Sequence, residues 1–414
     1  MVEYHKHKLE NGLEVLLSPN NYLHSASITV GFKYGLFNER NGETGVSHLI
    51  EHTVFEGSNK INHKKVKDFL ENKMNYYNGE THDEMTIYSF KFLDLSKYEK
   101  VFYTLSEMLF DSSFLEDSIK KEKNAVINEV QSKFDSEIQL DATIARAYMF
   151  RKPVFTFLGG NPKVIDGLSR ETMLDLYSKY YAPNNAVISI TGNFNSKDIM
   201  SGIKNYFESI EKANAKPKLE VYTGRTAYKN IHLKGFNIYK GQSSLVFGIK
   251  LPGAYQIYNK TERGRAAIVY LTDLLSGNLM RVLREKTGLA YSAGAEFHIG
   301  MHTGNLMLYT VVNNKDFEEA KSLIFDEIDD IAAGELDKKP LQKAKQELKL
   351  NIADLVDDSF DHSQALVRGK LNYGKDINEL YRESMKLSLD DLREAAANYL
   401  KKEGQDNSVL VTSN

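Results

Sequence analysis

The chain repeats its own pattern at one constant offset. The segment LSRETMLDLYSKYY at 168–181 aligns with LSLDDLREAAANYL at 387–400, and FLDLSKYEKVFYTLSEML at 92–109 aligns with VVNNKDFEEAKSLIFDEI at 311–328. Two halves of similar topology would explain why one offset serves several elements, whereas unrelated domains would need several coincidences. The repeat therefore predicts two domains that are built on one plan.

Local patterns predict the α+β class for these domains, with a mixed or antiparallel sheet packed against helices in each. The segment EKANAKPKLE at 211–220 is charged, contains proline and lacks periodicity, so we place a linker at 211–225 between domains 1–210 and 226–414. Periodicity in the first half predicts the following elements: strands near 5–18, 25–34, 85–92 and 186–194, and helices at about 44–55, at 64–72 and from about residue 96.

Composition narrows the possible partners. The 414 residues are 42% hydrophobic and carry a net charge of −3, with acids and bases interspersed, so no basic surface for nucleic acid is indicated. No signal-like apolar core opens the chain, and no apolar run approaches the ~20 residues of a membrane span, which predicts a cytoplasmic protein without membrane contact. Cysteine is absent, so any metal must be bound by His, Asp or Glu.

The segment GVSHLIEHTVFEGS at 45–58 contains the best candidate for a metal site. On a helix, His48 and His52 lie on one face, one turn apart, where both rings can bind one zinc ion. Glu51 is placed to act as a general base, and H-x-x-E-H is the inverted zinc-peptidase motif. The alternative is ordinary decoration of a helix, since a catalytic zinc usually has three protein ligands.

With this motif the chain resembles the pitrilysin, insulin-degrading enzyme and mitochondrial processing peptidase family of zinc peptidases. In that family a glutamate ligand follows the motif after a long gap of fixed length, in a helix with another acid two turns earlier. Counted from His52, the ligand position in this sequence is Glu129 and the earlier acid is Glu122, within KEKNAVINEV at 121–130. The resemblance therefore implies one Zn²⁺ per chain on His48, His52 and Glu129, with Glu122 as an outer group that orients the site.

The segment NGETHDEMTIYSF at 78–90 resembles the strand of this family whose exposed edge pairs with the substrate backbone. By resemblance, Asn78, Gly79, Thr81 and Tyr88 are substrate-binding residues, with Gly79 in the place of the customary alanine. His82 is expected to be a solvent-facing loop residue and not a ligand, because three ligands are already assigned.

The segment LREKTGLAYSAGAEF at 283–297 resembles the arginine and tyrosine pair of the same family. Arg284 and Tyr291 match it, and a guanidinium with a phenol could bind the scissile carbonyl and stabilise the oxyanion. Without the zinc motif, we would interpret Arg284 as part of a solvated helix end and Tyr291 as a core residue of a strand.

The resemblance implies a zinc-dependent endopeptidase that hydrolyses oligopeptides or unfolded segments. Because the chain has both the zinc motif and the Arg–Tyr pair, the resemblance implies a homodimer that closes as a clamshell around a chamber, with each site completed by the other copy. At the offset of the repeat, Ala267, Tyr270 and Leu271 replace His48, Glu51 and His52, so only the first half is expected to hold metal. The alternatives are a non-catalytic peptide-binding or assembly subunit and a metal-stabilised structural protein.

Overall fold

A computed structural model describes residues 2–93, 98–214, 219, 222–234, 241–258, 263–336 and 338–413. The chain divides into two compact units, and neither unit is one continuous segment. The first unit comprises Met1–Val130, Gly159–Glu220 and Leu350–Asn378, and the second comprises Gln131–Leu158, Val221–Lys349 and Glu379–Asn414. Each unit has one sheet with helices, so the predicted α+β class with two domains is confirmed.

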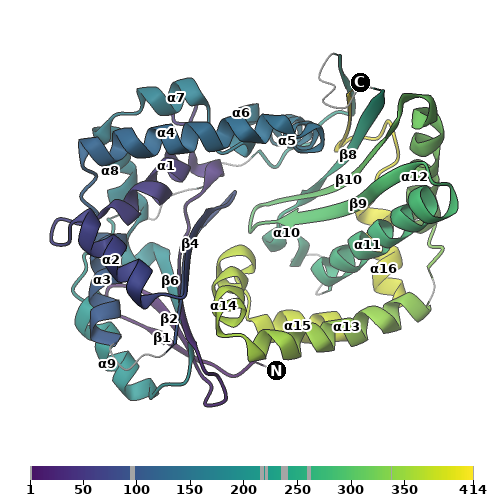
Figure 1. Cartoon of the computed structure of the whole chain (residues 1–414). Helices are drawn as coiled ribbons and strands as arrows, with labels where there is room; N and C mark the ends of the chain where they lie inside the picture. Colours follow the sequence, from purple (N-terminus) through teal and green to yellow (C-terminus); the bar gives the residue numbers. More distant parts are fainter. Residues whose placement is uncertain are drawn as a thin grey trace. The chain divides into compact units, whose positions relative to one another are not determined.

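The first unit contains a six-stranded mixed sheet in the order β1-β2-β6-β3-β5-β4. Figure 1 labels β1, β2, β4 and β6 of this sheet. Strands β2 and β6 run parallel, and the other neighbouring pairs are antiparallel. Strand β4 is an edge strand of this sheet. The strands span β1 His5–Lys8, β2 Glu14–Pro19, β3 Ala26–Phe32, β4 Tyr76–Thr81, β5 Thr86–Phe92 and β6 Ala186–Gly192.

The second unit repeats this topology in a five-stranded sheet with the order β7-β11-β8-β10-β9. Its β7 and β11 are parallel and its other neighbouring pairs antiparallel, as in the β2-β6-β3-β5-β4 part of the first sheet. The repeat expected from sequence is therefore present in the order and direction of the strands. They span β7 Lys229–Leu233, β8 Gln242–Pro252, β9 Ala290–Ile299, β10 Thr303–Asn313 and β11 Ser408–Ser413.

Helices follow the same repeat, since the offset seen in the sequence relates α8 to α16 at both of their ends. Those of the first unit are α1 Val46–Thr53, α2 His63–Lys73, α3 Tyr98–Phe110, most of α4 Glu116–Ser132, α7 Pro162–Gly167, α8 Arg170–Tyr180, α9 Ser196–Phe207 and α14 Ser359–Tyr373. Those of the second are α5 Glu137–Phe150, α6 Val154–Phe157, α10 Ala254–Tyr258, α11 Gly264–Leu279, α12 Phe317–Ala332 and α16 Leu389–Tyr399. The chain passes between the units within α13 Lys338–Asp357 and α15 Ile377–Met385.

The two halves of the sequence exchange one helix each. Helix α14 comes from the second half but packs on β3, β5 and β6, where Leu366, Val367 and Leu371 join the core of the first unit. Gly31 of β3 permits this approach, because a methyl group at Gly31 would lie 2.5 Å from a methyl group of Val367. Helix α5 of the first half packs on β8 and β11 of the second unit.

This exchange differs from the continuous domains 1–210 and 226–414 that we expected. An amphipathic pattern shows which face of a helix is apolar, but it does not show which of two similar sheets that face covers. The division between the units at Glu220 and Val221 falls within the expected linker 211–225, of which residues 215–218, 220 and 221 lie outside the described residues.

One helical stretch among the described residues, Gly264–Lys286, is long and apolar enough to cross a membrane by length and composition. This differs from the expectation that no apolar run reaches that length. The stretch joins α11 to the π-helical segment η5 Met280–Lys286 and packs against β9 and α16. More than half of its most apolar window is buried in the protein, so the core of the second unit accounts for its apolar character.

Candidate metal centre

Helix α1, which carries the H-x-x-E-H motif, has a sharply defined start. Gly45 precedes it with φ of 103°, a conformation that glycine adopts without strain. The carboxylate of Glu39 accepts hydrogen bonds from the backbone N–H groups of Gly45 and Ser47 at 2.9 and 3.0 Å, and from the Ser47 hydroxyl. Glu39 is buried and therefore satisfies the free N–H groups at the start of α1 with a negative charge, which a helix N-terminus favours.

The two histidine rings are oriented by acceptors on their Nδ1 atoms. The Nδ1 atom of His48 lies 3.2 Å from the carbonyl oxygen of Gly159, and that of His52 lies 3.0 Å from Oε2 of Glu122. If each Nδ1 carries the proton that these acceptors require, each Nε2 atom presents its lone pair to a metal. The predicted outer role of Glu122 fits this contact.

Glu129 completes a set of three ligand atoms. Its Oε2 atom lies 3.4 Å from Nε2 of His48 and 3.7 Å from Nε2 of His52. Tetrahedral zinc with bonds of about 2.05 Å would place neighbouring ligand atoms about 3.3 Å apart. The two distances from Glu129 are within a few tenths of an ångström of this spacing, and all three ligand atoms lie within 4.8 Å of one another. Among the described residues, this is the only group of three or more His, Asp or Glu side chains whose ligand atoms all lie within this distance of one another, close enough to share a metal ion.

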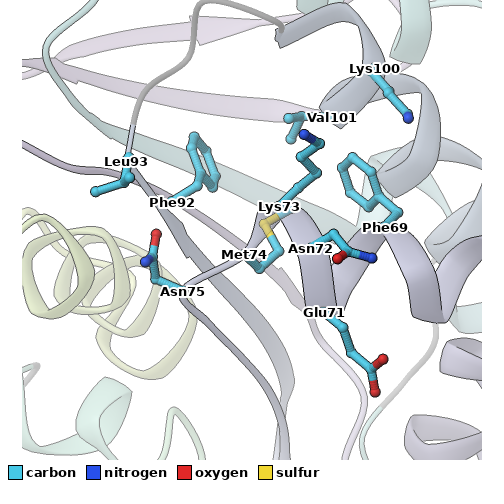
Figure 2. Close-up of a pocket in the computed structure, with 10 residues that line it drawn as sticks. All are labelled: Phe69, Glu71, Asn72, Lys73, Met74, Asn75, Phe92, Leu93, Lys100 and Val101. Carbon is cyan, nitrogen blue, oxygen red and sulfur yellow. The ribbon is translucent and has the colours of Figure 1, made fainter.

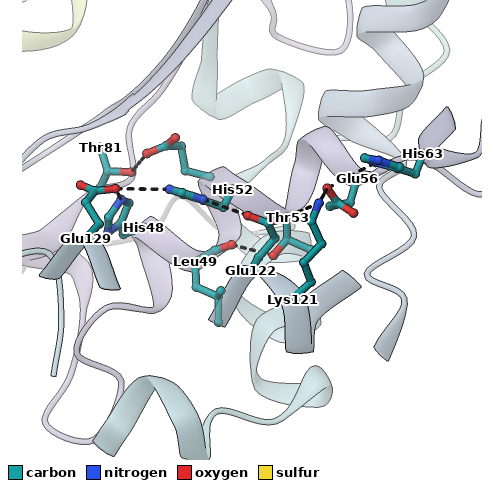
Figure 3. Close-up of polar contacts among 11 residues, drawn as sticks. His48, Leu49, His52, Thr53, Glu56, His63, Thr81, Lys121, Glu122 and Glu129 are labelled. Atoms are coloured by element: carbon teal, nitrogen blue, oxygen red, sulfur yellow. Dashed lines mark hydrogen bonds and ion pairs between the residues drawn. The ribbon is translucent and has the colours of Figure 1, made fainter. Parts of the chain in front are cut away.

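A chain of polar contacts continues from His52 through α4 to Glu56, just after α1, and to His63 at the start of α2 (Figure 3). Lys121 lies 3.1 Å from Oε1 of Glu122 and 2.8 Å from Oε1 of Glu56, and Nδ1 of His63 lies 3.3 Å from the same Glu56 oxygen. Glu122 and Glu56 are buried, whereas Lys121 is exposed. The Lys121 ammonium thus compensates the two buried carboxylates behind His52.

The electrostatics of these side chains favour cations. Burial opposes the charged form of His52, but its hydrogen bonds to Glu122 and Glu129 outweigh this and raise its pKa to about 10. Burial also opposes ionisation of Glu122, yet contacts with His52 and Lys121 hold the pKa of Glu122 below its usual range. A zinc ion would take the place of the proton on His52, so its binding would release a proton.

Glu51 points toward strand β4. Its Oε2 atom accepts a hydrogen bond of 3.0 Å from the Thr81 hydroxyl, and its side chain is buried. Burial raises the pKa of Glu51, and the neighbouring His48 and His52 oppose that rise. A carboxylate with this basicity beside the metal ligands could take up a proton from water.

The segment 78–90, expected to be one strand, is a hairpin of β4 and β5. Asn78, Gly79 and Thr81 lie on the edge strand β4, as the resemblance implies. Tyr88 lies on β5, where its side chain is fully buried and its hydroxyl is 2.7 Å from that of Tyr181. The expectation that Tyr88 binds substrate is therefore wrong for its side chain, because the strand alternation directs it into the core.

His82 and the Arg–Tyr pair also have clear positions. His82 lies in the turn between β4 and β5, 3.3 Å from Glu80, and is not part of the cluster of metal ligands.

In the second unit, the Arg284 guanidinium on η5 stacks over the Tyr291 ring on β9 at 4.8 Å from its centroid. Both side chains are exposed, so the structure brings this predicted pair together on a surface.

Two contributors to the site were not predicted from sequence. Glu39 precedes the motif by nine positions and could have been suspected as a cap, because an acid near a helix start is favourable. The Gly159 carbonyl that contacts His48 is a backbone group 111 residues away, and no side-chain pattern could reveal it.

A separate pocket lies on the first unit, at the end of α2 (Figure 2). Neither the metal ligands nor Glu51 line it. Its walls come from α2, the end of β5 and the start of α3: Phe69, Glu71, Asn72, Lys73, Met74, Asn75, Phe92, Leu93, Lys100 and Val101.

Comparisons with known proteins match both halves of this chain. A family model described as Insulinase (Peptidase family M16) matches residues 14–154, and one described as Peptidase M16 inactive domain matches residues 167–348. A Rickettsia bellii protein named uncharacterized zinc protease is 24% identical, over 94% of this chain and 93% of that protein. The uncharacterized zinc protease YmxG of Bacillus subtilis is 23% identical over 93% of each.

Solved structures show the same fold over the whole length. A protease from Helicobacter pylori has a TM-score of 0.88 at 19% identity, with full coverage of both chains. A Pseudomonas fluorescens structure described as a peptidase M16 inactive domain has a TM-score of 0.86 at 18% identity, covering 99% of this chain and 98% of that one.

Proposed function

We propose that this chain, which belongs to the M16 (insulinase) family of peptidases, is a zinc-dependent endopeptidase of oligopeptides or unfolded polypeptide segments. The observation that carries the proposal is the convergence of three ligand atoms. Glu129 Oε2 lies 3.4 and 3.7 Å from the Nε2 atoms of His48 and His52, with Glu51 on the same helix as both histidines.

Zinc held by His48, His52 and Glu129 would supply the Lewis acidity that makes water nucleophilic near neutral pH. In this proposal Glu51 accepts the proton of the attacking water and delivers it to the leaving amine. Glu122 and the Gly159 carbonyl hold the two imidazoles in the tautomer that ligation requires.

Substrate would bind as an added strand on the edge of β4. Such pairing uses main-chain donors and acceptors that every peptide offers except at proline, which would allow varied sequences to be accepted. Arg284 and Tyr291 would bind carbonyl oxygens of the substrate and stabilise the developing oxyanion. The exposure of both side chains and their mutual contact support this role.

We also propose that the active unit is a homodimer in which Arg284 and Tyr291 of one copy complete the site of the other. The support is that this chain carries both the metal ligands and the Arg–Tyr pair, so two identical copies have every group that two sites need.

Hydrolysis of quenched peptides, measured together with zinc content, tests the proposed activity. We expect a chelator to abolish cleavage and added zinc to restore it, and we expect Glu51→Gln to retain zinc while losing at least about a hundredfold in rate. A mixed peptide library analysed by mass spectrometry would identify the cleaved bonds.

The alternative, a non-catalytic peptide-binding or assembly subunit, gives a different outcome in the same assay. Such a protein would bind zinc and peptides without cleaving any member of the library, and Glu51→Gln would change nothing that is measured. This result would overturn the proposed activity.

A further inference from the structure

The edge strand β4 meets the proposed base, Glu51, with one of its two faces. Alternate residues of a strand point to opposite sides, and Gly79 and Thr81 share the side toward Glu51. The Thr81 hydroxyl donates to Glu51 Oε2 at 3.0 Å. On the opposite side, Glu80 accepts from Asn78 and from Arg368 of α14.

Gly79 leaves the space in which the Glu51 carboxylate lies. A methyl group added at Gly79 would lie 2.5 Å from Glu51 Oε1 and 3.0 Å from its Cδ and Cγ atoms. Contacts that short cannot exist, so the end of the Glu51 side chain would have to move. In the present chain the carboxylate can approach the backbone of β4 more closely than it could beside an alanine.

The hairpin tip next to Thr81 is anchored from both sides. His82 donates its backbone N–H to Met85, and the backbone N–H groups of Leu36 and Phe37 donate to the carbonyls of His82 and Asp83 at 3.0 and 2.8 Å. These contacts fix the residues that follow Thr81, and pairing with Thr86 of β5 fixes Thr81 itself. The hydroxyl that holds Glu51 is therefore placed by a rigid element.

We propose that Gly79 and Thr81 form a seat that positions the Glu51 carboxylate for proton transfer. Gly79 provides the space, and Thr81 fixes Oε2 by its hydrogen bond. This inference rests on the proposed function, in which Glu51 is the general base, and it adds two positioning residues to it. The Glu51 side chain has three torsions, and fixing them costs conformational entropy. If the seat fixes them before substrate binds, this entropy is not lost during the reaction.

Two matched substitutions at position 81 test the seat. Thr81→Val keeps the shape but removes the hydroxyl, whereas Thr81→Ser keeps the hydroxyl and removes the methyl group. For the zinc-loaded protein we expect Thr81→Val to lower kcat by about tenfold or more, with zinc content and KM unchanged. Thr81→Ser should stay within about twofold of wild type. Equal losses in both variants would show that Thr81 acts through packing and would overturn the proposal.

Gly79→Ala provides a second, independent disturbance of the same carboxylate. If both residues act through Glu51, the Gly79→Ala/Thr81→Val double variant should lose little more kcat than the worse single variant. The reason is that a carboxylate already displaced by one substitution has no correct placement left for the second substitution to remove. Losses that multiply would show that the two residues act separately, which contradicts a shared seat.

Crystal structures of the zinc-loaded variants give a readout that does not depend on activity. We expect Glu51 Oε2 to stay within hydrogen-bond distance of residue 81 in the wild type and in Thr81→Ser, and to move in Thr81→Val and Gly79→Ala. An unmoved carboxylate in these last two variants would overturn the seat. The Glu51 carboxylate could move as expected in Thr81→Val and Gly79→Ala while the wild-type protein cleaves no peptide. That result would support the seat and would refute the proposed peptidase activity.

Discussion

The Nδ1 atom of His52 and the Oε2 atom of Glu122 lie 3.0 Å apart, and this contact links a candidate zinc ligand to a buried acid of α4. Glu122→Gln would keep an acceptor but remove the charge that strengthens the hydrogen bond from His52. We expect zinc affinity to fall by about ten- to a hundredfold, as measured by competition with a chelator. Glu116→Gln, an exposed acid of the same helix, is the matched control. Equal affinities in all three proteins would contradict the role of Glu122.

Glu129 should matter more for zinc than Glu122 does, because its oxygen is a proposed ligand and not a partner of one. We expect Glu129→Gln to lose zinc and peptidase activity together, since a neutral amide is a much weaker ligand than a carboxylate. Metal analysis after dialysis against dilute chelator measures the loss. Full zinc occupancy in this variant would mean that the third ligand lies elsewhere.

Glu39 is expected to stabilise the start of α1. Glu39→Gln would turn one of its acceptor atoms into a donor that faces a backbone N–H group, so we expect a loss of about 1–3 kcal/mol in the free energy of unfolding. Urea unfolding at neutral pH measures it, with Glu10→Gln at an exposed turn as the control. A stability equal to that of the control would show that the buried carboxylate contributes nothing as a cap.

His362 should make stability depend on pH. It is buried on α14, and burial lowers its pKa from 6.5 to about 4. Between pH 6.5 and pH 4 the unfolded chain binds a proton at His362 that the folded chain does not. The contribution of His362 to the free energy of unfolding is therefore complete above pH 6.5 and is lost as pH falls toward 4. From this residue we expect a loss of about 2 kcal/mol between pH 7 and pH 5.

The contribution of His362 is the difference between wild type and His362→Gln, a variant without a titrating ring. Urea unfolding of both proteins at pH 7 and pH 5 measures it, and other histidines cancel in the comparison. We expect the variant to lose about 2 kcal/mol less than wild type over this range. Parallel losses would mean that the His362 ring takes up its proton without resistance in the folded state.

Mixing two inactive variants tests whether the site is shared between copies. In a homodimer of Glu51→Gln chains, every site lacks the proposed base. In a homodimer of Arg284→Ala chains, every site lacks the proposed oxyanion-binding arginine. In a mixed dimer both defects fall in one site and the other site is intact, if Arg284 acts on the partner copy. With random re-pairing, about half the dimers are mixed, so roughly a quarter of wild-type activity should return.

Differently tagged chains serve as the control for this mixing experiment, because they show whether subunits exchange. If exchange occurs and activity stays at the level of the separate variants, each site is completed within one chain. That outcome would remove the shared-site homodimer and leave the zinc chemistry of the first unit untouched.

Much of the candidate site is local in sequence and could be predicted. His48 and His52 share a helix face because they are one turn apart, and Glu122 and Glu129 share one because they are two turns apart. The distance along the chain between these helices came from the family resemblance, and the structure places their ligand atoms together. The internal repeat of the sequence likewise predicted two sheets of one topology.

Side chains on strands were harder to predict. Tyr88 matched a substrate-binding pattern, yet its ring lies in the core, and Thr81 hydrogen-bonds Glu51 on a neighbouring element. The alternation of a strand gives two faces, and the sequence of that strand does not say which partner covers each face. The helix and strands that pack against the hairpin decide it.

By itself, the sequence determined the secondary structure around the motif and the placement of His48 and His52 on one helix face, because these depend on spacing along one element. The constant offset determined the duplicated plan, whereas the family resemblance supplied Glu129 as the third ligand. Only the tertiary structure decided that α5 and α14 are exchanged between the units and that the Gly159 carbonyl orients His48. Each of these depends on groups that are distant in the chain. Their meeting is set by the packing of whole elements, for which the residues concerned carry no local pattern.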